Sequence, residues 1–238
     1  MNKHHAEILA LIKESSGQAT QHTFLDSYLG NAHPRYAINA PAMRLIGKEW
    51  MKDHKKMSAP EFQKTLTSLI EGKSATEKCF AGILLDASTP DQRQFDPRSF
   101  ENWLDHLVGW AEIDSVCTGP YTITAIPGNF ATWKKILVRL SKSKNINKRR
   151  ASLAFLCSPL RRVKDERLGM LALENVDRLK HERAILITKA ISWVLRSMTS
   201  HHKELLEKYL KKNQKGLPAI AVRETLTKLK TGRKTVRL

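Results

Sequence analysis

The sequence has few cysteines and no long apolar run. Its three cysteines, Cys79, Cys117 and Cys157, lie far apart and form no CxxC pair, which argues against a disulfide framework or a structural zinc site. The nine histidines form no HExxH or similar ligand pattern. No apolar run approaches the ~20 residues that span a bilayer, and the start lacks the apolar block of a signal peptide. We therefore expect an intracellular protein that does not enter a membrane.

Acidic side chains are scarce in the C-terminal part of the chain. Residues 1–132 carry 13 basic and 15 acidic side chains, a net charge of −2, whereas residues 133–238 carry 28 and 8, a net charge of +20. A charge kept for solubility would be spread evenly. A one-sided excess attracts a polyanion, and nucleic acid is the leading candidate.

Strand signals are weak, and helix starts recur. Only YTITAIPG (121–128) alternates like a strand; it is short, a single helical turn and an extended link are both open for it, and no sheet is expected there. Between the helix starts, apolar residues recur every three or four positions, which predicts an all-α fold of about twelve to fourteen helices. The predicted caps are Ser58 with Glu61, Ser74 with Glu77, Asp96 with Pro97, Asn39 or Ala40, and Asn129.

The spacing of these starts favours consecutive antiparallel helix pairs. Such pairs stack into a curved solenoid whose inner helices line a concave surface, and a basic concave surface suits a duplex. The pairs are not alike in sequence, so a compact helical bundle stays open. We expect residues 1–231 to form one domain and residues 232–238 to form a basic tail.

Four stretches are candidates for chemistry on a polyanion. SYLGNAHPRYAINAPAMRLIGKEW (27–50) places Tyr28 and Asn39 near a helix start, where phosphate binds well; a plain loop with an Asn cap is the alternative. GWAEIDSVC (109–117) sets Trp110 and Asp114 one helical turn apart. That pair is either ordinary packing with a cap or a carboxylate beside an aromatic wall.

The other two stretches lie in the basic part of the chain. NKRRASLAFL (147–156) opens a helix with Lys148, Arg149 and Arg150, where three cations face a positive helix start unless phosphate or solvent offsets them. KAISWVLRS (189–197) puts Trp193 and Arg196 in an apolar helix, where a lone tryptophan is most often part of the core.

Together these stretches resemble a known family. YLGNAHPRYAIN, the W-x-x-x-D of GWAEIDSVC, the arginine before A-x-x-F-L in RRASLAFL, and AISWVLR occur in order, at spacings similar to those of the AlkD-like alkylpurine DNA glycosylases. The resemblance covers about residues 20 to 230. It implies HEAT-like helical repeats and the removal of positively charged N7- and N3-alkylpurines from duplex DNA, with the base left stacked. It implies no metal, no organic cofactor and no obligate protein partner.

The resemblance also implies roles for individual residues. Trp110 and Trp193 would flank the deoxyribose of the lesion, and Asp114 would lie near its anomeric carbon. A carboxylate there stabilises the oxocarbenium character of the departing sugar and can activate a water, and aromatic faces favour a developing cation. Arg150 would hold a backbone phosphate, which arginine can bind with two parallel hydrogen bonds.

The remaining candidates would contact the DNA backbone. Arg149 and Lys148 would lie beside Arg150 on the phosphates, and Tyr28 and Asn39 would lie near the lesion-bearing strand. Asn39 stands where the family pattern can have a longer amide. We expect a monomeric cytoplasmic protein, associated with the nucleoid in a prokaryotic cell.

Two further function classes are open at this point. A HEAT-like protein that binds damaged or branched DNA without cutting a glycosidic bond would have the same fold, but would lack parts of the Trp–Asp–Arg set that this chain retains. A protein-binding helical scaffold would need no such positive field. Both features favour the glycosylase.

Overall fold

Helices make up the regular structure of the protein. A computed structural model describes residues 1–17 and 33–235. Within these ranges it contains thirteen α-helices, one 3-10 helix and no strand, apart from an isolated bridge between Gly17 and Ala37. The prediction of an all-α fold is confirmed. None of the described helices has the length and apolar character that a membrane crossing requires.

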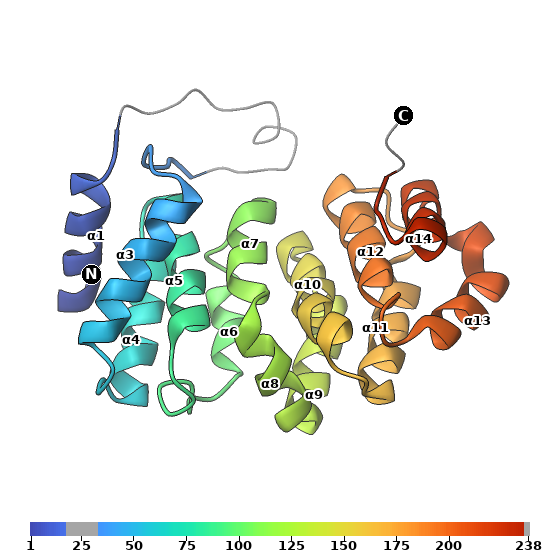
Figure 1. Ribbon diagram of the computed structural model, residues 1–238, viewed down its shortest axis with the longest axis horizontal. Coiled ribbons are helices and arrows are strands. Elements are labelled where there is room, and N and C mark those ends of the chain that lie inside the picture. The colour runs from blue at the N-terminus through green and yellow to red at the C-terminus, as the bar shows by residue number, and fades with distance from the viewer. Residues whose placement is uncertain (18–32, 236–238) are drawn as a thin grey trace. The chain divides into compact units, whose positions relative to one another are not determined.

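The chain divides into two compact units, Met1–Gly119 and Pro120–Leu238. The first unit contains α1 (Lys3–Glu14), α3 (Ala40–Asp53), α4 (Ala59–Ile70), α5 (Ala75–Ala87), α6 (Ser99–Trp103) and α7 (Gly109–Cys117). Helices α3, α5 and α7 form a row in which each packs on the next, while α1 packs on α3 and α4, and α4 packs on α5 (Figure 1). Phe62, Leu66, Phe80 and Leu84 are fully buried between them.

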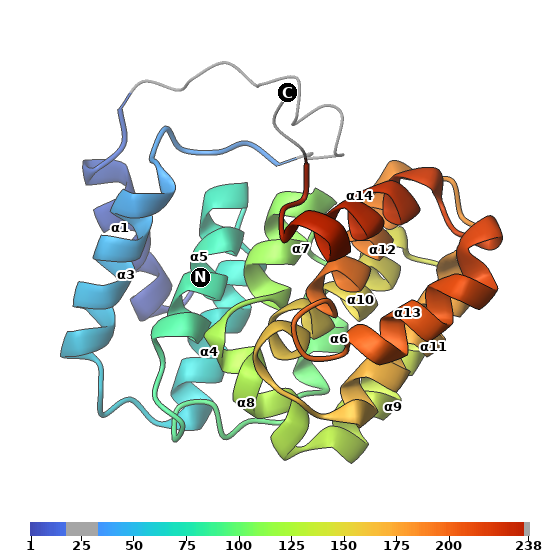
Figure 2. The same ribbon diagram turned by 45° about the vertical axis from the view of Figure 1, so that its right-hand side comes forward.

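The second unit repeats this arrangement with its own helices. They are α8 (Pro120–Gly128), α9 (Phe130–Ser141), α10 (Ile146–Arg162), α11 (Glu166–Leu179), α12 (Ile185–Ser197), α13 (Lys203–Asn213), the 3-10 helix η1 (Gln214–Gly216) and α14 (Ala219–Thr231). One row runs through α8, α10, α12 and α14, while α9 and α11 pack on each other and on α10 (Figure 2). Phe155, Ile191 and Val194 are fully buried in this core.

Several predicted helix starts are confirmed at atomic detail. The Asn39 side chain accepts the backbone N–H of Ala42 at 2.9 Å and caps α3. Ser74 and Glu77 form the predicted capping box at the start of α5. Burial alone would raise the pKa of Glu77, but hydrogen bonds from His5 and Ser74 lower it to about 2, so the box contains a charged carboxylate.

Other predictions differ in their local detail. Ser58 precedes α4, but its side chain makes no cap hydrogen bond. Asp96 does not cap a helix that begins at Pro97; its carboxylate accepts the N–H of Arg98, and α6 begins later, at Ser99. This is an Asx turn, in which the aspartate bonds to the backbone two residues further on.

The structure answers the question left open for YTITAIPG but not the question of a solenoid. YTITAIPG is part of α8 and is neither a single turn nor an extended link, since Tyr121, Thr122 and Ile126 are buried in a nine-residue helix. Helix α14 ends at Thr231, where Gly232 takes a left-handed conformation with φ of 72°. The solenoid that would join both units, and the single domain over residues 1–231, stay predictions.

Candidate nucleic-acid interface

Helix α7 is held in place by a buried carboxylate. Glu112 is fully buried, and its Oε2 accepts the N–H of Val108, just before the helix, at 2.8 Å. Its Oε1 lies 2.8 Å from Nδ1 of His33. Lys78, also buried, donates to the carbonyl of Ile70 at 2.6 Å. Burial lowers the pKa of Lys78, while the charge of Glu112 works in the opposite direction.

A close backbone contact sets the depth of α7 against α5. A Cβ atom added to Gly82 of α5 would lie 1.9 Å from the carbonyl oxygen of Ser115, so only glycine fits there. Glu112, Ile113, Val116 and Cys117 form the buried face of α7. The other face of this helix is therefore turned away from the core.

Trp110 and Asp114 share that other face, one turn apart, and both are half-buried. Asp114 lies inside α7 and does not cap it; its backbone carbonyl accepts the N–H and hydroxyl of Thr118. The indole nitrogen of Trp110 is buried and makes no hydrogen bond within the described residues. Trp110 and Asp114 of GWAEIDSVC therefore lie on one half-buried face of α7, and a catalytic role for Asp114 stays a prediction.

The predicted cations of the second unit occupy different environments. Lys148 is half-buried near the start of α10. Arg149 makes two bonds to the Glu182 carboxylate, at 2.7 and 3.0 Å, and two to the carbonyls of Ser143 and Lys144. These bonds connect the start of α10 to the end of α9 and the chain before α12. A phosphate would have to compete with them for Arg149.

Arg150 lies deeper than its predicted role suggests. It is 4% exposed, and its Nη1 donates to the carbonyl of Leu186 at 2.7 Å, which joins α10 to the first turn of α12. Most of its guanidinium therefore faces protein, and any phosphate would meet it only at the edge of the α10–α12 contact.

Helix α12 has a half-buried face on which two cations flank a tryptophan. Trp193 is half-buried rather than part of the core, and Lys189 and Arg196 lie on the same side at helical spacing. Arg196 pairs with Glu224 at 3.3 Å; burial lowers the pKa of this guanidinium, while the charge of Glu224 raises it. The i, i+4, i+7 spacing of Lys189, Trp193 and Arg196 was the signal for this face.

Two predicted DNA-binding residues remain, Asn39 and Tyr28. Asn39 is exposed, but its side-chain oxygen is already engaged as the α3 cap. Tyr28 lies outside the described residues. The structure thus brings Trp110 and Asp114 together in the first unit, and Lys148, Arg149 and Arg150 at the start of α10 in the second, next to α12 with Trp193.

Comparison with known proteins identifies the family. A family model described as DNA alkylation repair enzyme matches residues 11–229. The chain belongs to this family of DNA alkylation repair enzymes. The family relationship expected from the four sequence stretches is thereby confirmed.

The fold of the DNA alkylation repair family is also found among solved structures. A predicted DNA alkylation repair enzyme from Enterococcus faecalis matches with a TM-score of 0.68 and 16% identity, over 96% of each chain. At that identity the likeness concerns the fold. No curated protein matches the chain.

Proposed function

We propose that this member of the DNA alkylation repair family is a monofunctional glycosylase for N7- and N3-alkylated purines in duplex DNA. The observation that carries the proposal is the pair formed by Trp110 and Asp114 on the half-buried face of α7. An alkylated purine is a cationic leaving group, so its departure leaves positive charge on the sugar. An ionised carboxylate beside an aromatic ring supplies the stabilisation that this charge needs.

In the proposed reaction, the Asp114 carboxylate stabilises the oxocarbenium-like sugar and activates the attacking water. The C1′–N9 bond breaks, its electron pair stays with the purine and neutralises it, and water adds to C1′ to leave an abasic site. Trp193 of the second unit would offer an aromatic face to a bound sugar in the same way as Trp110. The base stays stacked, so lesions are selected by the weakness of their glycosidic bond rather than by a base pocket.

The charge of the second unit supports the choice of DNA as substrate. Residues 133–238 carry the whole positive excess, and all of them belong to this unit. Lys148 near the start of α10 and Lys189 on α12 are the cations best suited to the phosphates, since they are half-buried rather than enclosed. Arg150 would add a phosphate contact at the edge of the same helices, and Arg149 a weaker one.

The direct test uses a duplex with one N7-methylguanine. We expect abasic sites to form in the presence of the protein faster than by spontaneous depurination, and an undamaged duplex to remain intact. Tight binding to the lesion duplex without such an excess would support instead a DNA-binding protein that does not cleave the glycosidic bond.

A further inference from the structure

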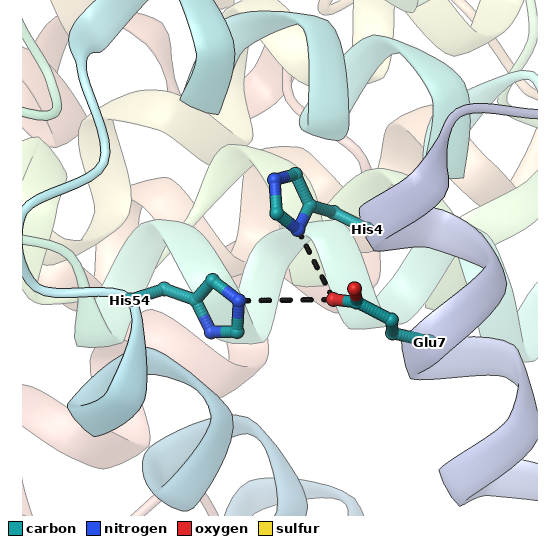
Figure 3. Close-up of side chains that lie close together, drawn as sticks. All are labelled: His4, Glu7 and His54. Atoms are coloured by element: carbon teal, nitrogen blue, oxygen red, sulfur yellow. Dashed lines mark hydrogen bonds and ion pairs between the residues drawn. The ribbon is translucent and has the colours of Figure 1, made fainter.

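A second cluster of side chains lies in the first unit, away from the residues proposed for glycosylase chemistry. His4 and Glu7 lie one turn apart on α1, and His54 follows directly after α3. Figure 3 shows both imidazole rings turned toward the Glu7 carboxylate. Nδ1 of His4 lies 3.1 Å and Nε2 of His54 lies 3.7 Å from the same oxygen, Oε2 of Glu7.

The hydrogen bonds around this cluster decide which ring nitrogens face its centre. Nδ1 of His54 lies 2.8 Å from the carbonyl of Trp50, which can only accept, so this nitrogen carries the proton. In the neutral ring, Nε2 of His54 then carries a lone pair and faces a carboxylate oxygen. Two acceptors facing each other at 3.7 Å are unfavourable unless a cation lies between them.

His4 repeats this pattern with a different partner. Its Nε2 lies 3.1 Å from Oε1 of Glu61 on α4, so a neutral His4 donates to Glu61 and turns the lone pair of Nδ1 toward Glu7. A carboxylate or backbone carbonyl behind a histidine is the usual outer partner of a metal ligand, because it fixes the tautomer and orients the ring. Here Glu61 and the Trp50 carbonyl hold those places.

The spacing of the three inner atoms fits a small divalent metal. Nδ1 of His4, a carboxylate oxygen of Glu7 and Nε2 of His54 all lie within 4.8 Å of one another. Donors at about 2.0–2.1 Å around a tetrahedral zinc ion lie roughly 3.3 Å apart, and the two distances to Glu7 are close to that value. Two histidines and one glutamate form a known three-ligand zinc set, which leaves a fourth position for water.

The surroundings give the cluster a defined shape. The ring of His54 stacks on Trp50 with centroids 3.9 Å apart, and His4 meets the same indole edge-on at 5.6 Å. The Trp50 indole nitrogen is buried and makes no hydrogen bond within the described residues. His4 is 14% exposed, and His54 and Glu7 are more open, so an ion has access.

We propose that His4, Glu7 and His54 form a zinc site that joins α1 to the end of α3, with Glu61 of α4 as an outer partner. The sequence pattern did not suggest it, because His54 lies far from His4 along the chain and only the packing of α1 on α3 and α4 brings them together. The site shares no residue with the proposed glycosylase machinery, so each proposal can fail without the other.

Metal binding to the untagged full chain tests the site. After dialysis against Zn²⁺, metal analysis and calorimetry should find one zinc per chain with saturable binding, and zinc should raise the melting temperature. Glu7→Gln should weaken zinc binding by at least about 100-fold and abolish the thermal shift, and Glu61→Gln should weaken it by about 10- to 100-fold. His106→Gln, an exposed histidine of the same unit, should bind as the parent does.

Spectroscopy separates this site from adventitious binding. Co²⁺ in place of zinc should give the intense visible bands of a four-coordinate site, and Glu7→Gln should remove them. Long-range ¹H–¹⁵N spectra should show zinc shifting Nδ1 of His4 and Nε2 of His54, with protons on the opposite nitrogens. The alternative for the same contacts is a protonated His4 between Glu7 and Glu61. Absence of saturable zinc binding, or binding that Glu7→Gln leaves unchanged, would overturn the proposal.

Discussion

Asp114 carries the proposed chemistry, and its surroundings separate its role from that of its neighbour Glu112. Glu112 is fully buried. One of its carboxylate oxygens contacts His33, and the other accepts the N–H of Val108. Asp114 lies two residues on, half-buried on the other face of α7 with Trp110. Glu112 therefore fixes the start of α7, whereas Asp114 shares the half-buried face of the helix with Trp110, where the proposed function needs a carboxylate.

Asp114→Asn should separate catalysis from binding. The amide keeps the shape of the side chain but removes the negative charge, so it stabilises the sugar cation poorly and cannot act as a base. We expect excision of N7-methylguanine to fall by about 100-fold or more, while duplex affinity and melting temperature change little. Single-turnover excision and a binding titration on the same duplex measure the two quantities.

Asp53→Asn is the matched control for that experiment. Asp53 is exposed at the end of α3 in the same unit, and its substitution makes the same change in charge. It should excise like the parent. If Asp114→Asn also excises like the parent, the carboxylate that acts on the sugar is another one.

The contact between α5 and α7 determines where the proposed catalytic face lies. Gly82 allows the backbones of the two helices to touch, and the Ser74–Glu77 capping box fixes the start of α5. Neither feature includes a residue of the half-buried face that carries Trp110 and Asp114. The position of Trp110 and Asp114 therefore depends on packing behind them as well as on their own helix.

Gly82→Ala should disturb this contact. The new methyl group would lie 1.9 Å from the Ser115 carbonyl oxygen, and backbone cannot move aside as a flexible side chain can. We expect the free energy of unfolding to fall by about 1–3 kcal/mol, and excision to fall because α7 shifts. Urea unfolding and the excision assay measure the two effects.

Gly128→Ala provides the comparison for Gly82. It changes the same residue type in a helix, but a Cβ at Gly128 meets nothing within 4 Å. The variant should be unchanged or more stable by up to about 1 kcal/mol, since alanine favours a helix. Equal losses of stability in the two variants would show that the α5–α7 contact is not the cause.

The sequence predicted helix starts well where the stabilising hydrogen bonds join residues close together in the chain. The Asn39 cap and the Ser74–Glu77 box each involve residues within one turn, so the sequence suffices to find them. YTITAIPG was harder, because its β-branched residues favour a strand while burial of Tyr121 and Ile126 against other helices favours α8. Packing against other helices, rather than the local preference for a strand, therefore determines the conformation of this stretch.

At the candidate sites, too, contacts between residues far apart in sequence could not be predicted from local patterns. The spacing of Trp110 and Asp114 predicted a shared face, and that is what α7 has. The bonds of Arg149 to Glu182 and of Arg150 to Leu186 each join residues more than thirty positions apart, so no local pattern reveals them. His54 meets Glu7 in the same long-range way.

The division of charge in the whole molecule coincides with its division into units. Residues 120–132 carry no Lys, Arg, Asp or Glu, so the second unit has the full net charge of +20 and the first has −2. A uniform field would bind DNA through either unit. Under the proposed function, the second unit would make the phosphate contacts and the first would supply Asp114.

The salt dependence of duplex binding tests this division of labour. Each phosphate contact releases condensed counterions, so the logarithm of the binding constant falls linearly with the logarithm of salt concentration. Replacing Lys148 and Lys189 together by Gln should reduce the slope by about one for each phosphate interaction that the change removes, for any duplex sequence. Replacing Lys55 and Lys56, two exposed residues of the first unit, by Gln removes the same charge and should leave the slope nearly unchanged. Equal reductions in both double variants would mean that total charge, rather than the face formed by α10 and α12, governs binding. A reduction confined to the first pair would place the DNA backbone on that face, within reach of Trp193.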